Sequence, residues 1–108
     1  MYRFNKILNE YMIIKLEKFG TTLVSRQSGK EAFLAFGPAL ESITNAKDVI
    51  IDFTGVITFS PSWGDEFITP IYKKYGSKLV LKNTSNSSVE ATLKILEDIN
   101  KVSFKKIN

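Results

Sequence analysis

The sequence predicts an α/β domain in which three helices pack on a mixed, mainly parallel sheet of about four to five strands. Two observations predict this class. Segments with strand and helix patterns alternate along the chain, an order typical of parallel sheets covered by helices. Residues 48–53 contain the run Val49-Ile50-Ile51 and end in Phe53, as expected of a strand buried on both faces. The 108 residues contain no linker or repeat, so we expect a single domain over residues 1–108.

The N-terminal part of the sequence predicts one strand, and it does not decide the secondary structure of two other segments. Residues 11–19 alternate between apolar and charged from Ile14 onward, which is typical of a half-buried strand, and Gly20 ends this pattern. Residues 21–26 are rich in β-prone side chains and form either a short second strand or a loop. Residues 2–9 are ambiguous between a short strand and an irregular arm.

The first helix is expected over residues 29–44. Ser28 and Glu31 have the spacing of a capping box, in which two side chains satisfy backbone groups of the first turn. Pro38, which follows Gly37, lacks an N–H donor and should kink the helix or divide it in two. The apolar residues at helical spacing should face the core: Phe33, Phe36, Leu40 and Ile43.

A turn and a helix start follow the central strand. Asp52 is expected to cap a turn at Thr54–Gly55 by accepting hydrogen bonds. A second apolar segment, residues 56–59, then leads into Ser60 and Pro61. These two residues suit the N-cap and the first position of a helix.

The second helix should therefore begin at Pro61 and end at Gly76. Pro70 lies in its middle, and Thr69 before it suits a new N-cap, so we expect two helical pieces rather than one. Large apolar side chains recur every four residues: Trp63, Phe67, Ile71 and Tyr75.

The C-terminal part predicts another strand and a third helix. Residues 78–82 have a strand pattern, and Ser87 and Glu90 repeat the capping-box spacing before a helix that should end near Asn100. The tail, residues 101–108, could add an edge strand. The predicted core face of the helix is Val89, Leu93, Leu96 and Ile99.

The composition argues against catalysis and against nucleic-acid binding. The chain has neither cysteine nor histidine, and so lacks thiol nucleophiles, disulfides, the usual metal ligands and the commonest general base. We therefore expect no enzyme activity, no cofactor and no metal site. The net charge is +4, but only Arg3 and Arg26 are arginines and the lysines are spread along the chain. No concentrated basic face is visible, so we expect no nucleic-acid partner.

We also expect a cytoplasmic protein without a membrane segment. No apolar run approaches the roughly 20 residues that a membrane-spanning helix needs. Residues 1–9 carry charged and amide side chains, which is unlike a signal peptide.

The segment around Asp52 carries a family resemblance. Asp52-Phe53-Thr54-Gly55-Val56, followed by hydroxyl groups at a helix start, resembles the STAS domain of bacterial anti-sigma factor antagonists. The order of motifs is more similar to the uncharacterised bacterial group called STAS-like, and this resemblance covers roughly residues 14–100. The residues that match that group are Gly20 and Arg26 before the first helix, Asp52 to Val56, Ser62 to Glu66, and the strand that ends at Asn83.

The resemblance implies a protein that binds a regulatory partner and does no catalysis itself. Ser62 falls on the serine that is phosphorylated in anti-sigma factor antagonists. The partner that the resemblance implies is a GHKL-type ATPase or kinase, or another regulatory subunit. The chain departs from the antagonist pattern nearby: Ser60 replaces an aspartate, Pro61 replaces the first serine, and Trp63-Gly64 replaces Gly-Leu. The pattern around Ser62 alone predicts only a residue of the first helical turn, whose hydroxyl supports the local backbone.

We name residues 58–66 the loop–helix corner and predict that this corner contacts the partner. Trp63 is either a core residue or a binding anchor, since both roles suit a tryptophan beside a loop. The candidate phosphoacceptor is Ser62, and the predicted contact residues are Thr58, Ser60, Ser62, Trp63, Asp65 and Glu66.

Other functions stay open at this point. A small-ligand or nucleotide-sensing domain is the main alternative, and exposed apolar residues on the Trp63 helix could make a homodimer. Asp52, Asp65 and Glu66 could form a Mg²⁺ pocket like that of receiver domains. Receiver domains also carry an acidic pair after the first strand, which this chain lacks, so capping of a turn by Asp52 is the favoured interpretation.

Overall fold

The described part of the chain forms a main sheet of four parallel strands. The structure is a computed structural model that describes residues 11–41 and 48–108. The strand order is β1 (Tyr11–Lys15), β3 (Asp48–Asp52), β5 (Leu79–Lys82) and β6 (Lys105–Ile107), and each neighbouring pair is parallel. The predicted α/β class is therefore confirmed, although the described pairings are all parallel rather than mixed.

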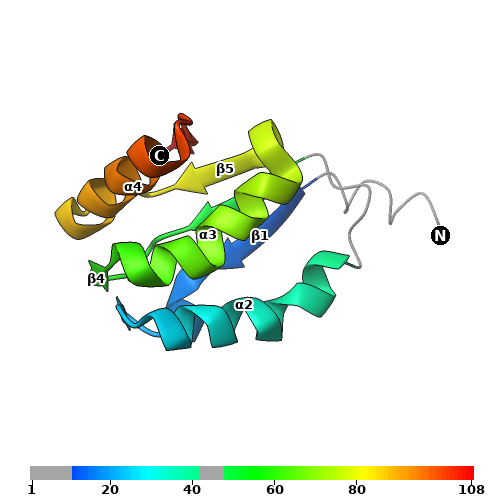
Figure 1. The fold of residues 1–108 in the computed structure, drawn as a ribbon, viewed down its shortest axis with the longest axis horizontal. Helices are drawn as coiled ribbons and strands as arrows, with labels where there is room; N and C mark the ends of the chain where they lie inside the picture. Colours follow the sequence, from blue (N-terminus) through cyan, green and yellow to red (C-terminus); the bar gives the residue numbers. More distant parts are fainter. Residues whose placement is uncertain (1–10, 42–47) are drawn as a thin grey trace.

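Within the described residues, three α-helices cover one face of this sheet. They are α2 (Arg26–Glu41), α3 (Pro61–Tyr75) and α4 (Ser87–Asn100). Each helix joins one strand of the main sheet to its neighbour, always in the same direction across the sheet. Because such crossovers have a single hand, all three helices lie on the same face, as Figure 1 shows. None of the described helices combines the length and apolar character needed to cross a membrane.

The hydrophobic core lies between this sheet face and the helices. Alternate residues of each inner strand point into it, as the period of a strand requires. The sheet contributes Ile14, Val49, Ile51, Leu79 and Leu81, and the helices contribute Phe36, Leu40, Phe67, Ile68, Ile71, Leu93 and Leu96.

A second, two-stranded sheet lies at the end where the strands of the main sheet finish. It pairs β2 (Thr22–Leu23) with β4 (Thr58–Phe59) in parallel. Residues 21–26 therefore contain the short strand, which was one of the two predicted alternatives. The parallel arrangement brings the start of each helix to this same end of the molecule (Figure 1).

The first strand is shorter than predicted. It ends at Lys15, and residues Leu16–Phe19 form a 3-10 turn that Gly20 closes with a backbone φ of 129°. The apolar–charged alternation extends past the end of the strand, because Leu16 is buried although it belongs to the turn. The pattern therefore made the strand look longer than it is. The predictions for residues 2–9 and for Ile43 fall outside the described residues.

Two of the predicted helix caps are wrong. Helix α2 begins at Arg26, because the Ser25 hydroxyl already accepts the Ser28 N–H at 3.0 Å. Helix α4 is capped by Asn86, whose side-chain oxygen accepts N–H groups of Ser88 and Val89 at 2.7 and 3.0 Å. In both cases a polar side chain upstream of the predicted serine takes the capping role.

Neither proline divides its helix in two. The two pieces predicted for α3 are therefore wrong, and of the alternatives predicted for Pro38 the division into two helices is excluded. Helix α2 continues through Pro38 to Glu41, and helix α3 continues through Pro70 to Tyr75. Burial of apolar residues on both sides of each proline outweighs the lost backbone hydrogen bond. The predicted N-cap Ser60 and the predicted end at Gly76 are both confirmed.

The remaining elements agree with the sequence. Strand β5 covers residues 79–82, one residue shorter than predicted, and helix α4 ends at Asn100 as expected. The C-terminal tail adds the edge strand β6, which pairs with β5.

Candidate functional site

The loop–helix corner is held by backbone hydrogen bonds to the segment around β2. The N–H groups of Ile57 and Thr58 donate to the Thr21 carbonyl oxygen at 2.8 and 3.1 Å. The Ser60 N–H donates to the Leu23 oxygen at 3.0 Å. The exposed Thr58 side chain therefore projects from an anchored strand rather than from a loose loop.

Helix α4 holds the corner from the other side. The buried Thr92 hydroxyl donates to the Phe59 carbonyl oxygen at 2.6 Å, and the Ser88 hydroxyl accepts the Phe59 N–H at 2.9 Å. The Asn86 amide donates to the carbonyl oxygens of Val56 and Ile57 at 3.3 and 3.2 Å. Side chains from the start of α4 thus bind the backbone of β4, which makes the corner rigid.

Ser60 has a structural role at the start of α3. Its hydroxyl donates to the Val24 carbonyl oxygen at 2.6 Å and accepts the Trp63 N–H at 3.3 Å. The same atom therefore caps the helix and ties it to the chain after β2. A partner could reach Ser60 only in competition with these internal bonds.

Ser62 differs from Ser60 in this respect. It is the second residue of α3 and is half-buried. Its hydroxyl forms no hydrogen bond with the described part of the chain. The N-terminal turn of a helix favours negative charge, because unpaired N–H groups and the positive end of the dipole meet there. Of the two serines, Ser62 is the one whose hydroxyl is available for chemistry.

Trp63 is a core residue in this structure. Its side chain is 1% exposed. The indole packs against the rings of Phe19, Phe59 and Phe67, with centroids 6.1, 6.0 and 5.1 Å away. Of the two roles predicted for Trp63, the structure shows the core role, so its side chain cannot contact a partner without a rearrangement.

Asp65 and Glu66 share one arginine. One guanidinium nitrogen of Arg26, at the start of α2, lies 3.1 Å from an Asp65 oxygen and 2.7 Å from a Glu66 oxygen. The hydrogen bond to Glu66, followed by that to Asp65, raises the pKa of the Arg26 guanidinium above its ordinary value. Because residues three and four apart share a helix face, Ser62 lies on the same face of α3 as both acids.

Asp52 belongs to a separate network at the ends of β3 and β5. Its carboxylate accepts the Thr54 N–H at 2.9 Å, the Thr54 hydroxyl at 2.7 Å and the Asn83 amide at 2.9 Å. Burial by itself raises the pKa of Asp52, but these hydrogen bonds and the charge of Lys82 outweigh it, so the pKa lies below its ordinary value. The predicted cap of the turn at Thr54–Gly55 is confirmed.

The three acids considered for a magnesium pocket are thus occupied in two different networks. Asp52 binds Thr54 and Asn83, whereas Asp65 and Glu66 bind Arg26. Among residues 11–41 and 48–108, no group of three potential ligands is placed to hold a metal ion.

The sequence interpretation missed two apolar residues beside the corner. Ile57 is 64% exposed and directly precedes β4, and Val24 is 43% exposed and directly follows β2. Their neighbours Val56, Phe59 and Leu23 are buried. For Val24 the signal was the period of a strand, since it follows the buried Leu23. For Ile57 the period gave no such signal, because it places Ile57 on the same face as the buried Phe59.

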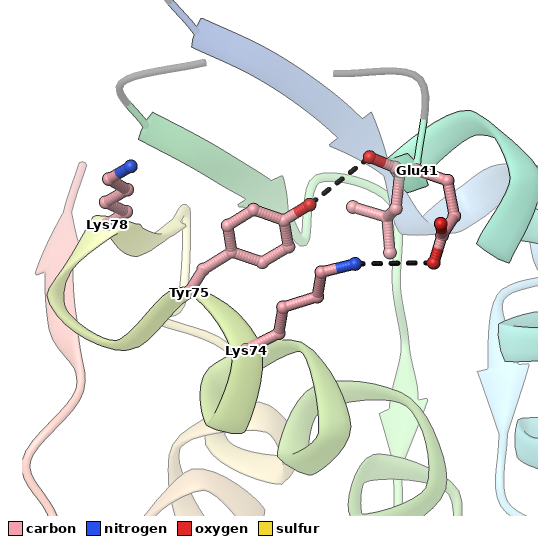
Figure 2. Close-up of a pocket in the computed structure, with 5 residues that line it drawn as sticks. Glu41, Lys74, Tyr75 and Lys78 are labelled. Atoms are coloured by element: carbon pink, nitrogen blue, oxygen red, sulfur yellow. Dashed lines mark hydrogen bonds and ion pairs between the residues drawn. The ribbon is translucent and has the colours of Figure 1, made fainter. Parts of the chain in front are cut away.

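A concavity of about 320 Å³ lies at the opposite end of the helices (Figure 2). There the Lys74 ammonium lies 3.3 Å from a Glu41 oxygen, and the Tyr75 hydroxyl donates to the Leu40 carbonyl oxygen at 3.2 Å. Lys78 also lines it. Cations are favoured at helix C-termini in the absence of any ligand, so these lysines do not by themselves indicate an anion site.

The comparison with protein families agrees with the α/β fold. Residues 38–89 match a family described as "STAS-like domain of unknown function (DUF4325)". The match confirms the STAS-like resemblance predicted from the sequence, over the segment that runs from α2 into α4 and contains the whole corner. No curated protein and no solved structure matches the chain.

Proposed function

We propose that this protein is a regulatory binding module that does no catalysis itself and contacts a protein partner through the loop–helix corner. The observation that carries the proposal is the combination found there. Two exposed apolar side chains, Ile57 and Val24, and the half-buried Ser62 belong to segments whose backbone is fixed from two sides around β4. Rigid presentation lowers the entropy lost on binding, and apolar side chains supply the buried contact area.

The corner contact is regulated by phosphorylation of Ser62 in this proposal. A phosphate would add a charge of about −1.5 to −2 at the start of α3, which the helix dipole tolerates. The charges of Asp65 and Glu66 one turn later oppose it, but Arg26 already offsets part of them. In this proposal a charged group within the contact surface disfavours burial of Ile57 and Val24 by a partner.

The STAS-like resemblance supports a partner of the GHKL ATPase or kinase type. Such a partner could both bind the corner and modify Ser62, which would make the contact self-limiting. The residues proposed for the contact are Thr58, Ser62, Ile57 and Val24, with Asp65 and Glu66 at the border.

Variants at Ser62 test this function. Ser62→Ala should leave both folding and partner binding intact, because the hydroxyl makes no hydrogen bond with the described residues. Ser62→Asp should weaken partner binding about tenfold or more by placing a charge in the contact. Ser77→Asp, on the exposed turn after α3, is the matched control and should bind normally. Equal affinity of the Ser62→Asp and Ser62→Ala proteins would remove the switch.

A further inference from the structure

The outer face of α4 carries an apolar stripe that no described residue covers. Ala91, Ile95 and Ile99 follow one another at intervals of four residues, which places them on one face of the helix. Ile95 is 42% exposed and Ile99 is 65% exposed. The prediction that Ile99 faces the core is therefore wrong, and the core face of α4 ends with Leu96. We call Ala91, Ile95 and Ile99 the α4 stripe.

A row of charged residues runs beside the α4 stripe. Glu90, Lys94, Asp98 and Lys101 are all exposed, and their charges alternate as negative, positive, negative, positive. The same row read from its other end is positive, negative, positive, negative. Two copies of the row are therefore complementary when they run in opposite directions, whereas two copies running in the same direction would place like charges opposite each other.

We infer that the α4 stripe binds a second copy of this chain, with the two α4 helices antiparallel about a two-fold axis near Ile95. In this arrangement Ile95 faces its own counterpart, and Ala91 faces Ile99 of the partner subunit. Lys94 then lies near Asp98 of the partner subunit, and each such contact occurs twice because the interface is isologous. The antiparallel helix dipoles also attract each other.

This dimer contact goes beyond the proposed function and does not depend on it. The α4 stripe contains no residue of the loop–helix corner, so each copy in the dimer would keep its own corner. The small size of the stripe predicts a weak dimer whose population depends on protein concentration.

Sedimentation equilibrium of the full chain, over a wide range of protein concentrations, tests the inference. The wild-type chain should show a monomer–dimer equilibrium, and Ile99→Glu should be monomeric throughout. Leu34→Glu is the matched control, because Leu34 is 63% exposed on α2 and should not affect dimerisation. A monomeric wild-type chain, or a dimer that survives Ile99→Glu but not Leu34→Glu, overturns the inference.

Charge exchange tests the antiparallel geometry. Asp98→Lys should weaken the dimer, because it places a positive charge opposite Lys94 at both symmetric positions. The double variant Lys94→Asp/Asp98→Lys restores complementary charges and should recover dimerisation at least in part. Both sites are exposed, so folding should be unaffected. A double variant as monomeric as Asp98→Lys alone would contradict this arrangement.

Discussion

Asp52 illustrates how a single carboxylate can organise the end of a sheet. It is 6% exposed, and it binds the turn after β3 and Asn83 at the end of β5. Asn83 adopts a left-handed backbone conformation with φ of 59°, which asparagine tolerates better than most residues. The network therefore fixes both strand ends next to the loop that leads to the corner.

The lowered pKa of Asp52 predicts a specific pH dependence of stability. A carboxyl whose pKa is lower in the folded state stabilises the protein fully above its unfolded value of 3.8, and this stabilisation is lost as the pH falls below that value. Asp52→Ala should lower the free energy of unfolding by about 1–3 kcal/mol at pH 7. Urea denaturation of both proteins should show this difference shrinking below pH 3.8. A difference that stays constant across this range would contradict the role given to the carboxylate.

Gly29 is the residue that permits α2 to approach α3. A Cβ atom there would lie 2.7 Å from the carbonyl oxygen of Trp63 and 3.0 Å from its Cα. Gly29→Ala should therefore lower the free energy of unfolding by about 1–3 kcal/mol, since backbone atoms cannot easily move aside. Gly37→Ala in the same helix is the control, because a Cβ there meets no atom within 4 Å, and it should cost far less. Thermal denaturation compares the two, and equal losses would refute this account of the contact.

At the scale of elements, the start of α3 separates a structural serine from an available one. Ser60→Ala removes the hydroxyl that accepts the Trp63 N–H at the start of α3 and donates to the Val24 carbonyl oxygen. It should therefore lower the free energy of unfolding by about 1–3 kcal/mol. Ser62→Ala should change it by much less. Denaturant titration of both proteins measures the contrast, and a Ser62→Ala loss as large as that of Ser60→Ala would remove the distinction.

Much of the order of elements could be predicted from the sequence, because strand and helix periods are strong local signals. The caps of α2 and α4 could not, since Ser25 and Ser28, or Asn86 and Ser87, are locally equivalent candidates. Contacts across the fold decide between them: Asn86 also binds the backbone of Ile57, which fixes the start of α4. Pro70 misled the prediction for a related reason, because tertiary burial outweighs a local preference.

The candidate site was predicted in part. The sequence located the corner and the capping role of Ser60, and the structure confirms that role. It did not settle the role of Trp63, since an aromatic residue near a helix start suits both core and surface. It also missed the pairing of Asp65 and Glu66 with Arg26, because those residues are 39 and 40 positions apart from the arginine in the sequence.

At the scale of the whole molecule, the topology explains why one end carries the candidate site. Crossovers that all run in one direction place the three helices on one face and their N-termini at one end (Figure 1). Loops at the carboxyl ends of parallel strands are the usual place for binding sites in such folds. The outer face of α4 is left for a different contact, with a second copy of the chain.

The central claim is that the loop–helix corner binds a protein partner under the control of Ser62. The most direct measurement is affinity capture of the tagged chain from its source cells, followed by quantitative mass spectrometry. The wild-type, Ser62→Ala and Ser77→Asp chains should retain one stoichiometric partner, and part of the wild-type chain should carry phosphate on Ser62. The Ser62→Asp and Ile57→Asp chains should lose that partner. A partner retained equally by all five chains, or a chain that returns alone, would contradict the claim and favour ligand sensing or self-association.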